Sequence, residues 1–332
     1  MLQQKIPPTP PDTNLAGQTV IVTGGNAGLG LETARQLLVL GASRMIVACR
    51  SVSRGEEAVA TLRADAQLAK KNPDAIIEVF ELDLDDYASA LRFTDRVKKD
   101  VKELDILLNN GGISVPNFET SKSGHERTMQ VNCYTYALIC LELLPLLRST
   151  AALRGRPTRI TFVGSNLHVR GTSIAKTPIP AGRSVMEHFD DPARFSKLTR
   201  YGDSKLGVAA LTRRLATLAP DEVVVNHMCP GMVSTAFDKN QPLWIRAPMV
   251  LVRGVMARDV EEGARAIVYA AAVAGPETNG KFVRNNAVEP GSLFLDKPEG
   301  GSFIDGLWKD VMKDIVKLDP SLESYVSLNG SV

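Results

Sequence analysis

The stretch "TVIVTGGNAGLG", residues 19–30, decides the fold. Its first five residues are β-branched, as is typical of a buried strand. The glycine-rich half leads into "LETARQLLVL" (31–40), where apolar residues recur at helical spacing. Glycines at the start of a helix allow its backbone N–H groups to approach a phosphate, because no Cβ intervenes. The stretch therefore predicts a strand, a phosphate-binding turn and a helix, although tight turns of this kind also use glycine for packing.

Strand-like and helical segments alternate along the rest of the chain. Apolar runs occur at "RMIVACR" (44–50), "AIIEVFELDL" (75–84), "LDILLNNGG" (104–112), "RITFVGS" (159–165) and "VVVNHMCPG" (223–231), with helical stretches between them. These runs are too continuous for a sheet with one wet face, so they indicate a parallel sheet covered by helices on both faces. The predicted fold class is α/β, a single doubly wound domain.

Segments outside this alternation set the expected boundaries. Residues 1–15 are rich in proline and predict a flexible arm ahead of the main domain, 16–285. Segments 166–200 and 234–258 follow strand ends, where open α/β sheets bind ligands, so both are predicted substrate loops. The last segment, 286–332, is a C-terminal extension expected to pack on the domain, although a lid or a subunit contact is compatible with it. Its helical stripe of apolar residues comprises Ile304, Leu307, Trp308, Val311 and Ile315.

The composition argues against several classes of partner. Lys and Arg total 39 against 37 for Asp and Glu, and a net charge of +2 offers no field for nucleic acid. No uninterrupted apolar run reaches the roughly 18 residues of a membrane span, and no signal-peptide core precedes the domain. The cysteines lie in apolar runs without paired spacing, which predicts buried thiols in a reducing, cytoplasmic compartment and no metal site. They are Cys49, Cys133, Cys140 and Cys229.

Five short motifs in a fixed order carry a family resemblance. They are "TGGNAGLG" (23–30), "NNGG" (109–112), Gly164-Ser165 after a strand, "YGDSK" (201–205) and "PGMVST" (230–235). With them the chain resembles a classical short-chain dehydrogenase/reductase over about residues 15–285, and it is similar to the retinol-dehydrogenase-like branch and to natural-product tailoring reductases. The resemblance implies a Rossmann-type domain that binds a nicotinamide dinucleotide. "NNGG" has glycine where the family has alanine, and the loss of that methyl group is expected to change little.

The cofactor expectations centre on the glycine turn and on the end of the second strand. Gly24, Gly28 and Gly30 would meet the pyrophosphate. Where an acid would bind the ribose hydroxyls, the chain has Cys49 followed by Arg50, and a cation there pairs with a 2′-phosphate. Arg50 therefore favours NADP(H), unless it only faces solvent. By the resemblance, the cofactor would also contact Asn26, Leu29, Asp83 near the adenine, Asn109 beside the adenosine, Val233, Thr235, Tyr201 and Lys205.

The catalytic expectations concern four side chains. Tyr201 and Lys205 share one helix face, so Tyr201 could exchange a proton with the reacting oxygen while Lys205 lowers its pKa. Ser165 would bind that oxygen. Asn132 is a poor helix former in a helical stretch, and the resemblance implies that it holds a water of the proton path while Lys205 holds the nicotinamide ribose.

The predicted function is an NADP(H)-dependent oxidoreductase for a carbonyl or secondary alcohol of a fairly hydrophobic small molecule, in a biosynthetic setting. Phe237, Trp244 and Met249 could line its pocket, or belong to a core helix or dimer contact; a homo-oligomer is compatible with the sequence. The main alternative is a nucleotide sensor or scaffold of the same fold without turnover. An extended-type epimerase would need a different glycine spacing and a larger C-terminal domain.

Three histidines could take part in other chemistry. A hydrolase using Ser165 and His168 lacks the G-x-S-x-G elbow, so His168 is expected to face solvent or substrate. His125 and His188 are lone histidines expected in polar loops, and neither has a spacing that would bind a metal.

Overall fold

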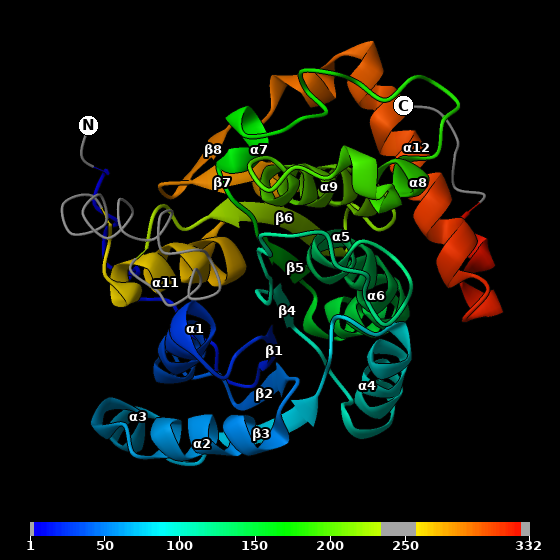
Figure 1. Cartoon of the computed structure of the whole chain (residues 1–332). Helices are drawn as coiled ribbons and strands as arrows, with labels where there is room; N and C mark the ends of the chain where they lie inside the picture. The colour runs from blue at the N-terminus through cyan, green and yellow to red at the C-terminus, as the bar shows by residue number, and fades with distance from the viewer. Residues whose placement is uncertain (1–2, 234–256, 327–332) are drawn as a thin grey trace.

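The computed structural model describes residues 3–233 and 257–326. Its centre is an eight-stranded sheet in the order β3-β2-β1-β4-β5-β6-β7-β8 (Figure 1). Neighbouring strands pair in parallel as far as β7, and β8 pairs antiparallel with β7. The strands are β1 (Thr19–Thr23), β2 (Arg44–Cys49), β3 (Ile76–Glu81), β4 (Ile106–Asn109), β5 (Thr158–Val163), β6 (Val223–Cys229), β7 (Phe282–Arg284) and β8 (Ala287–Glu289). The predicted doubly wound α/β fold is confirmed.

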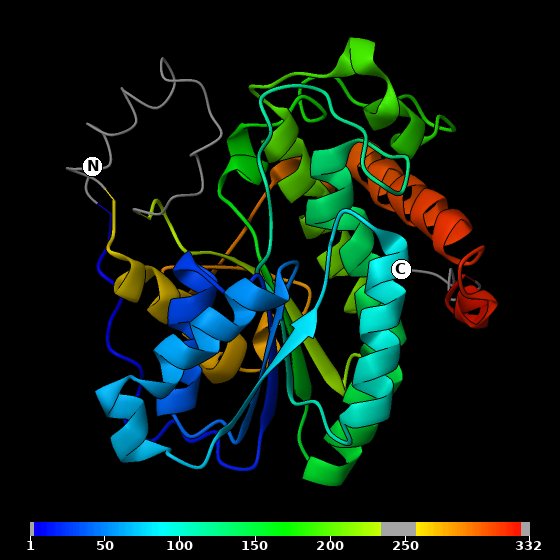
Figure 2. The same ribbon diagram turned by 60° about the horizontal axis from the view of Figure 1, so that its bottom comes forward.

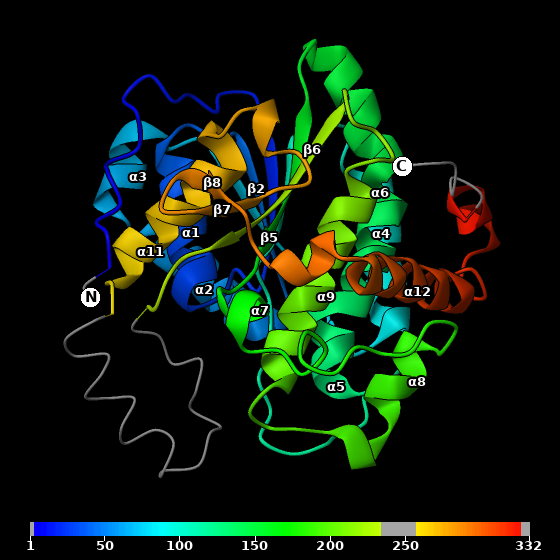
Figure 3. The same ribbon diagram turned by 90° about the horizontal axis from the view of Figure 1, so that it is seen from above.

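Helices cover both faces of the sheet (Figures 2 and 3). Alternate residues of β1 face opposite cores, with Val20 and Val22 in one hydrophobic cluster and Ile21 in the other, as the twofold period of a strand requires. One face carries α1 (Gly28–Val39), α2 (Val52–Arg63), α3 (Ala66–Lys71) and α11 (Val260–Val268). The other carries α4 (Tyr87–Asp100), α6 (Thr135–Arg154) and α9 (Arg200–Leu215), with α12 (Pro298–Ile315) outside α9.

Short helical segments lie in the connections at the carboxyl ends of the strands. They are α5 (Arg127–Met129), α7 (Leu167–Arg170) and α8 (Val185–Asp190). Two π-helical turns, Gln130–Tyr134 and Tyr269–Val273, continue the courses of α5 and α11. The first π-helical turn joins α5 to α6, and it contains Asn132.

The helical stretch 127–154 has the length and composition of a membrane span, and it is the one such stretch in the parts of the chain that the structure describes. However, 67% of its most apolar window is buried inside the protein, where it contributes to the larger core. We therefore describe α6 as a core helix. All four cysteines are buried free thiols, as the sequence predicted.

Both terminal segments lie against the domain. Residues 3–15, predicted as a flexible arm, place Ile6 and Leu15 in the core, each only 3% exposed. In the extension, α12 buries Leu307, Trp308 and Ile315 against neighbouring helices that include α8 and α9. The extension thus completes the hydrophobic core on the outer side of α9.

Candidate active site

The end of β5 and the start of α9 bring the predicted catalytic side chains together. Ser165 follows β5 and Tyr201 lies in the first turn of α9. Lys205, one turn further along, is buried, and its Nζ donates to the Val163 carbonyl at 2.8 Å. This hydrogen bond ties α9 to the last residue of β5. The Lys205 Nζ lies 5.5 Å from the ring centroid of Tyr201.

The residues between Tyr201 and Lys205 explain why the motif reads "YGDSK". A Cβ on Gly202 would lie 2.0 Å from the carbonyl oxygen of Gly171, so only glycine allows α9 to approach the end of α7 this closely. The buried carboxylate of Asp203 accepts the backbone N–H and the hydroxyl of Ser173, both at 2.7 Å. These contacts hold the start of the predicted loop 166–200 beside Tyr201.

Both polar atoms of the Asn132 side chain form hydrogen bonds within the protein. Its Oδ1 accepts the Ile113 backbone N–H at 2.8 Å, and its Nδ2 donates to the Ile113 carbonyl at 2.9 Å and to the Ser204 hydroxyl at 2.9 Å. The Ser204 hydroxyl in turn donates to the Tyr201 carbonyl at 2.8 Å. The π-helical turn around Asn132 is of a kind often found at functional sites. Asn132 thus joins the loop after β4 to the first turn of α9, while the predicted water relay stays a prediction.

Burial changes the pKa values of both Tyr201 and Lys205. Burial raises the pKa of the Tyr201 phenol above its usual range, and a hydrogen bond with Ser165 opposes the rise. Burial also lowers the pKa of Lys205 to about 8. Desolvation of the phenol is the largest cause of its raised pKa. The prediction that Lys205 lowers the pKa of Tyr201 stays a prediction.

The glycine turn has room for a phosphate. Gly24 and Gly28 adopt positive φ angles of 63° and 54°, and a Cβ on Gly28 would have no neighbour within 4 Å. Helix α1 begins at Gly28, and no side chain caps it at Ala27, so its first N–H groups are available to an anion. Gly30 serves packing instead, since a Cβ there would lie 2.4 Å from the Gly24 carbonyl oxygen. The residues present therefore fit a dinucleotide pyrophosphate.

Two asparagines follow one another at the end of β4. The Asn109 side chain is buried and donates to Cys140 Sγ at 3.3 Å, and its place beside the adenosine stays a prediction. The neighbouring Asn110, for which the sequence predicts no role, donates to the Thr23 carbonyl at 2.8 Å and supports the glycine turn. The doubled asparagine at a strand end was the signal that could have identified it.

Gly111, the third residue of "NNGG", lies close to two side chains. A Cβ on Gly111 would lie 2.8 Å from Leu84 Cδ1 and 3.0 Å from the Tyr136 hydroxyl. That hydroxyl donates to the Gly111 carbonyl at 2.6 Å. Leu84 and Tyr136 therefore lie where the methyl group of an alanine would be, and the expectation that its loss changes little stays a prediction.

Comparisons with known proteins agree with this geometry. A family model described as "short chain dehydrogenase" matches residues 18–175. The chain is 60% identical over 288 residues to "Short chain dehydrogenase sor7" of Hypocrea jecorina (strain QM6a), a match that covers 87% of this chain and 80% of that protein. It is 40% identical over 316 residues to "Short chain dehydrogenase macD" of Penicillium terrestre, covering 95% and 96% of the two chains. The chain belongs to the short-chain dehydrogenase/reductase family.

Solved structures with bound dinucleotides share the fold of this short-chain dehydrogenase/reductase. The "Pseudomonas aeruginosa RhlG/NADP active-site complex" aligns with a TM-score of 0.61 at 26% identity, covering 83% of this chain and 97% of that one. An NADH-dependent reductase complexed with NAD aligns with a TM-score of 0.60 at 18% identity, which supports the fold. Proteins of this family bind NAD(P). The two aligned structures contain NADP and NAD, respectively.

Three more predicted cofactor residues of the short-chain dehydrogenase/reductase, Leu29, Val233 and Asp83, lie in described segments. Leu29 and Val233 converge on Gly263 of α11, where a Cβ would lie 3.0 Å from Leu29 Cδ2 and 2.7 Å from Val233 Cγ2. Asp83 accepts from Lys122 Nζ at 2.7 Å, a contact that the sequence did not suggest.

Other predicted residues have simpler placements. Asn26 lies partly exposed in the glycine turn, and Arg50 is exposed after β2. Four predicted residues lie outside the described residues: Thr235, Phe237, Trp244 and Met249.

The histidines of the short-chain dehydrogenase/reductase are structural. His168 is buried, contrary to expectation, and its Nδ1 bonds the carbonyl of Ser165 at 2.6 Å rather than the hydroxyl that a hydrolase base would need. His125, expected in a polar loop, lies between Asp190 and Asp314. Within residues 3–233 and 257–326, no group of three or more His, Cys, Asp or Glu side chains could hold a metal.

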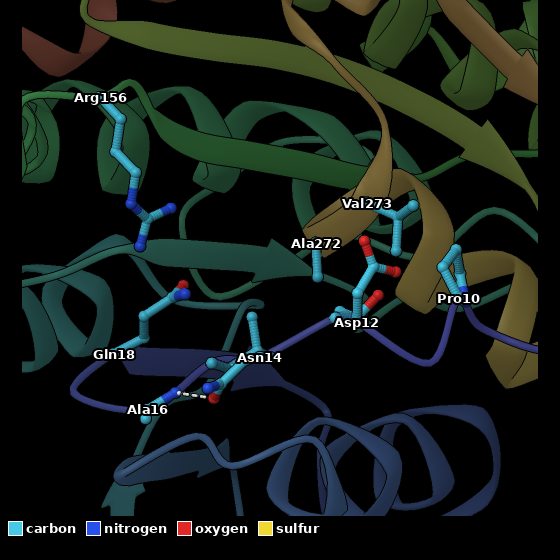
Figure 4. Close-up of a pocket in the computed structure, with 10 residues that line it drawn as sticks. Pro10, Asp12, Asn14, Ala16, Gln18, Arg156, Ala272 and Val273 are labelled. Atoms are coloured by element: carbon cyan, nitrogen blue, oxygen red, sulfur yellow. Dashed lines mark hydrogen bonds between the residues drawn. The ribbon is translucent and has the colours of Figure 1, made fainter.

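A surface cavity of about 450 Å³ lies away from this chemistry (Figure 4). Its walls include Asp12, Asn14 and Gln18 from the N-terminal segment, with Arg156 opposite. Gln18 precedes β1 and Arg156 precedes β5, so the cavity opens at the amino ends of the strands. The predicted catalytic residue Ser165 follows the carboxyl end of β5, and we assign the cavity no role in the reaction.

Proposed function

We propose that the protein is an NADP(H)-dependent oxidoreductase that acts on a carbonyl or secondary alcohol of a fairly hydrophobic small molecule. The bound nicotinamide would donate or accept the hydride at the reacting carbon. The Tyr201 hydroxyl would exchange a proton with the substrate oxygen, and the Ser165 hydroxyl would bind that oxygen. A phenol is protonated near neutral pH, the state that a carbonyl reduction requires, and burial raises the pKa of Tyr201 further. Lys205 would hold the nicotinamide ribose.

The observation that carries the preference for NADP(H) is the pair of side chains at the end of β2. Cys49 is buried and donates its S–H to the Ser51 carbonyl at 3.2 Å. Burial raises the pKa of this thiol, so it is uncharged where an NAD-binding protein would carry an acid. Arg50, the next residue, is exposed. A 2′-phosphate beside it would gain a charge-assisted hydrogen bond.

Binding titrations test the cofactor preference. We expect the protein to bind NADPH at least about tenfold more tightly than NADH, since a hydrogen bond between charged groups contributes about 1.5–3 kcal/mol. Arg50→Ala should lose that difference while the affinity for NADH is retained. Arg63→Ala, which removes an exposed arginine from the far end of α2, is the matched control. Equal affinities of the wild-type protein for NADPH and NADH would contradict the proposal.

Turnover measurements test the chemistry. Tyr201→Phe should abolish NADPH-dependent reduction of carbonyl compounds and leave the affinity for NADPH nearly unchanged, because only the hydroxyl is lost. Full activity of that variant would rule the mechanism out. A wild-type protein that binds NADPH but consumes it with no member of a broad carbonyl panel would instead favour the sensor or scaffold.

The hydrophobic character of the substrate is supported by apolar side chains near the catalytic residues in sequence. Leu167 is 50% exposed two residues after Ser165, and Leu198 is 78% exposed three residues before Tyr201. Such exposure of large apolar side chains is typical of binding surfaces when they cluster. We expect KM to fall as the apolar part of a ketone grows, and a KM independent of apolar size would contradict this.

The setting is a further part of the proposal. We place the protein in the cytoplasm, which its four buried free thiols support, since disulfides are rare in that compartment. We place its reaction in a biosynthetic sequence, for which the similarity to tailoring reductases is the support.

A further inference from the structure

The first described residues of the chain form hydrogen bonds with the loop after β6. We call residues 3–6 the strap and residues 230–233 the β6 loop. The Gln3 side chain pairs with the backbone of Met232 in both directions, since Nε2 donates to the carbonyl at 2.9 Å and Oε1 accepts the N–H at 2.9 Å. Further along, the Ile6 backbone N–H donates to Glu262 Oε1 at 2.8 Å. The strap thus binds both the β6 loop and α11, beside which the start of the chain runs in Figures 1 and 3.

The buried Arg258 also binds both the strap and the β6 loop. The Arg258 guanidinium donates to the Pro230 carbonyl at 2.8 Å, to Asn285 Oδ1 at 2.7 Å and to the Gln4 carbonyl. Its backbone N–H donates to the Met232 carbonyl at 2.9 Å. One side chain therefore joins the strap, the β6 loop and the turn after β7.

The β6 loop is shaped for this contact. Gly231 has a φ of 84°, a conformation that favours glycine. A Cβ at this position would lie 2.2 Å from Gln3 Oε1 and 2.6 Å from Arg258 Nη1. The glycine thus leaves space for both the strap and Arg258. A flexible arm would need no such space, so the fit points to a specific role for the strap.

The β6 loop leads directly to the cofactor turn. It ends at Val233, which is buried and packs against Gly263 together with Leu29 from the start of α1. Val233 also forms a parallel bridge with Arg258. A displacement of Met232 would therefore move Val233 relative to the turn that fits the pyrophosphate.

We propose that the strap is a positioning element of the dinucleotide site, acting through the β6 loop. Gln3 is the positioning residue whose side chain holds the loop, and Arg258 supports both. With the strap in place, the loop is held in its binding geometry before the cofactor arrives, which lowers the cost of ordering it on binding. The cofactor part of this inference rests on the proposed function, whereas the restraint on the loop does not.

The test compares two glutamine variants of the full-length protein. Gln3→Ala removes the two hydrogen bonds to Met232, and Gln4→Ala removes an exposed side chain of the same size while its backbone carbonyl still accepts from Arg258. Amide hydrogen exchange of the peptide containing Met232 is measured on the cofactor-free protein, and the Kd for NADPH is measured by fluorescence. Thermal unfolding of both variants checks that the fold is retained.

We expect Gln3→Ala to raise the exchange rate at Met232 about tenfold and the Kd for NADPH about fivefold, because two hydrogen bonds of ordinary strength are lost. Gln4→Ala should change neither. An unchanged exchange rate in Gln3→Ala would overturn the restraint, and faster exchange with an unchanged Kd would overturn its role in cofactor binding. If the wild-type protein binds no dinucleotide, the proposed function and the cofactor role fail together, while the exchange data still decide whether the strap restrains the loop.

Discussion

His125 offers the sharpest prediction, because it joins three segments that are distant in sequence. Its Nδ1 lies 2.7 Å from the carboxylate of Asp190 in α8, and its Nε2 lies 3.1 Å from that of Asp314 in α12. Burial lowers the pKa of His125, but the hydrogen bonds to both carboxylates outweigh it and raise the pKa from 6.5 to about 9. The protonated imidazole therefore holds the predicted loop 166–200 and the C-terminal extension together.

The pKa shift converts into a contribution to stability. A rise from 6.5 to about 9 corresponds to roughly 3 kcal/mol in favour of the folded state. The His125 side chain is 17% exposed, so solvent screens part of this energy and the value is an upper bound. Because the folded pKa lies above the unfolded one, the contribution is complete below about pH 6.5 and is lost as the pH rises through about 9.

The assay is urea unfolding of the wild-type protein and of His125→Gln between pH 6 and pH 10. We expect the variant to be less stable by up to about 3 kcal/mol at pH 6 and the difference to shrink toward pH 10. The difference is the relevant quantity, since Lys205, whose pKa burial lowers to about 8, adds a pH dependence of opposite sign to both proteins. The neighbouring Tyr87 and Tyr134 have pKa values raised well above 10 by burial and stay neutral.

His188→Gln provides the matched control. His188 lies in α8 beside Arg194, and burial together with that arginine lowers its pKa, so it stays neutral throughout the window above pH 6.5. This variant should have the same slope of stability against pH as the wild-type protein. If His125→Gln also kept the wild-type slope between pH 6.5 and pH 9, the assignment of a charged His125 to this network would be refuted.

Two further predictions concern the contacts of Gly202 and Asp203, in the first turn of α9, with Gly171 and Ser173. Gly202→Ala should lower the free energy of unfolding by at least about 1–3 kcal/mol, because its Cβ would lie 2.0 Å from the Gly171 carbonyl oxygen. A Cβ on Gly301 in α12 would have no atom within 4 Å, so Gly301→Ala should raise the free energy of unfolding by about 0.5–1 kcal/mol. Urea midpoints check both, and equal effects would show that crowding is not the cause. Asp203→Ala should cost about 1–3 kcal/mol and raise KM for the substrate more than it lowers kcat, since Ser173 loses its acceptor. Unchanged stability and kinetics in this variant would contradict that role for Asp203.

The placement of Ser165, Tyr201 and Lys205 could be predicted because each sits at the end of a locally recognisable element. A strand end and a helix start at the same edge of a parallel sheet bring such residues together whatever the loops between them do. The same reasoning located the glycine turn and Arg50. It failed for His168, because the direction of a side chain near a strand end depends on neighbours from distant segments.

By itself, the sequence determined the doubly wound sheet, the order of its elements and the edge at which the site lies, because the periods of strands and helices are local properties of the chain. Only the tertiary structure decided the burial that raises the pKa of Tyr201, the carboxylates around His125 and the docking of residues 3–6 on the loop after β6. These depend on desolvation and on hydrogen bonds between residues far apart in sequence, and no local pattern encodes which distant group will lie within reach.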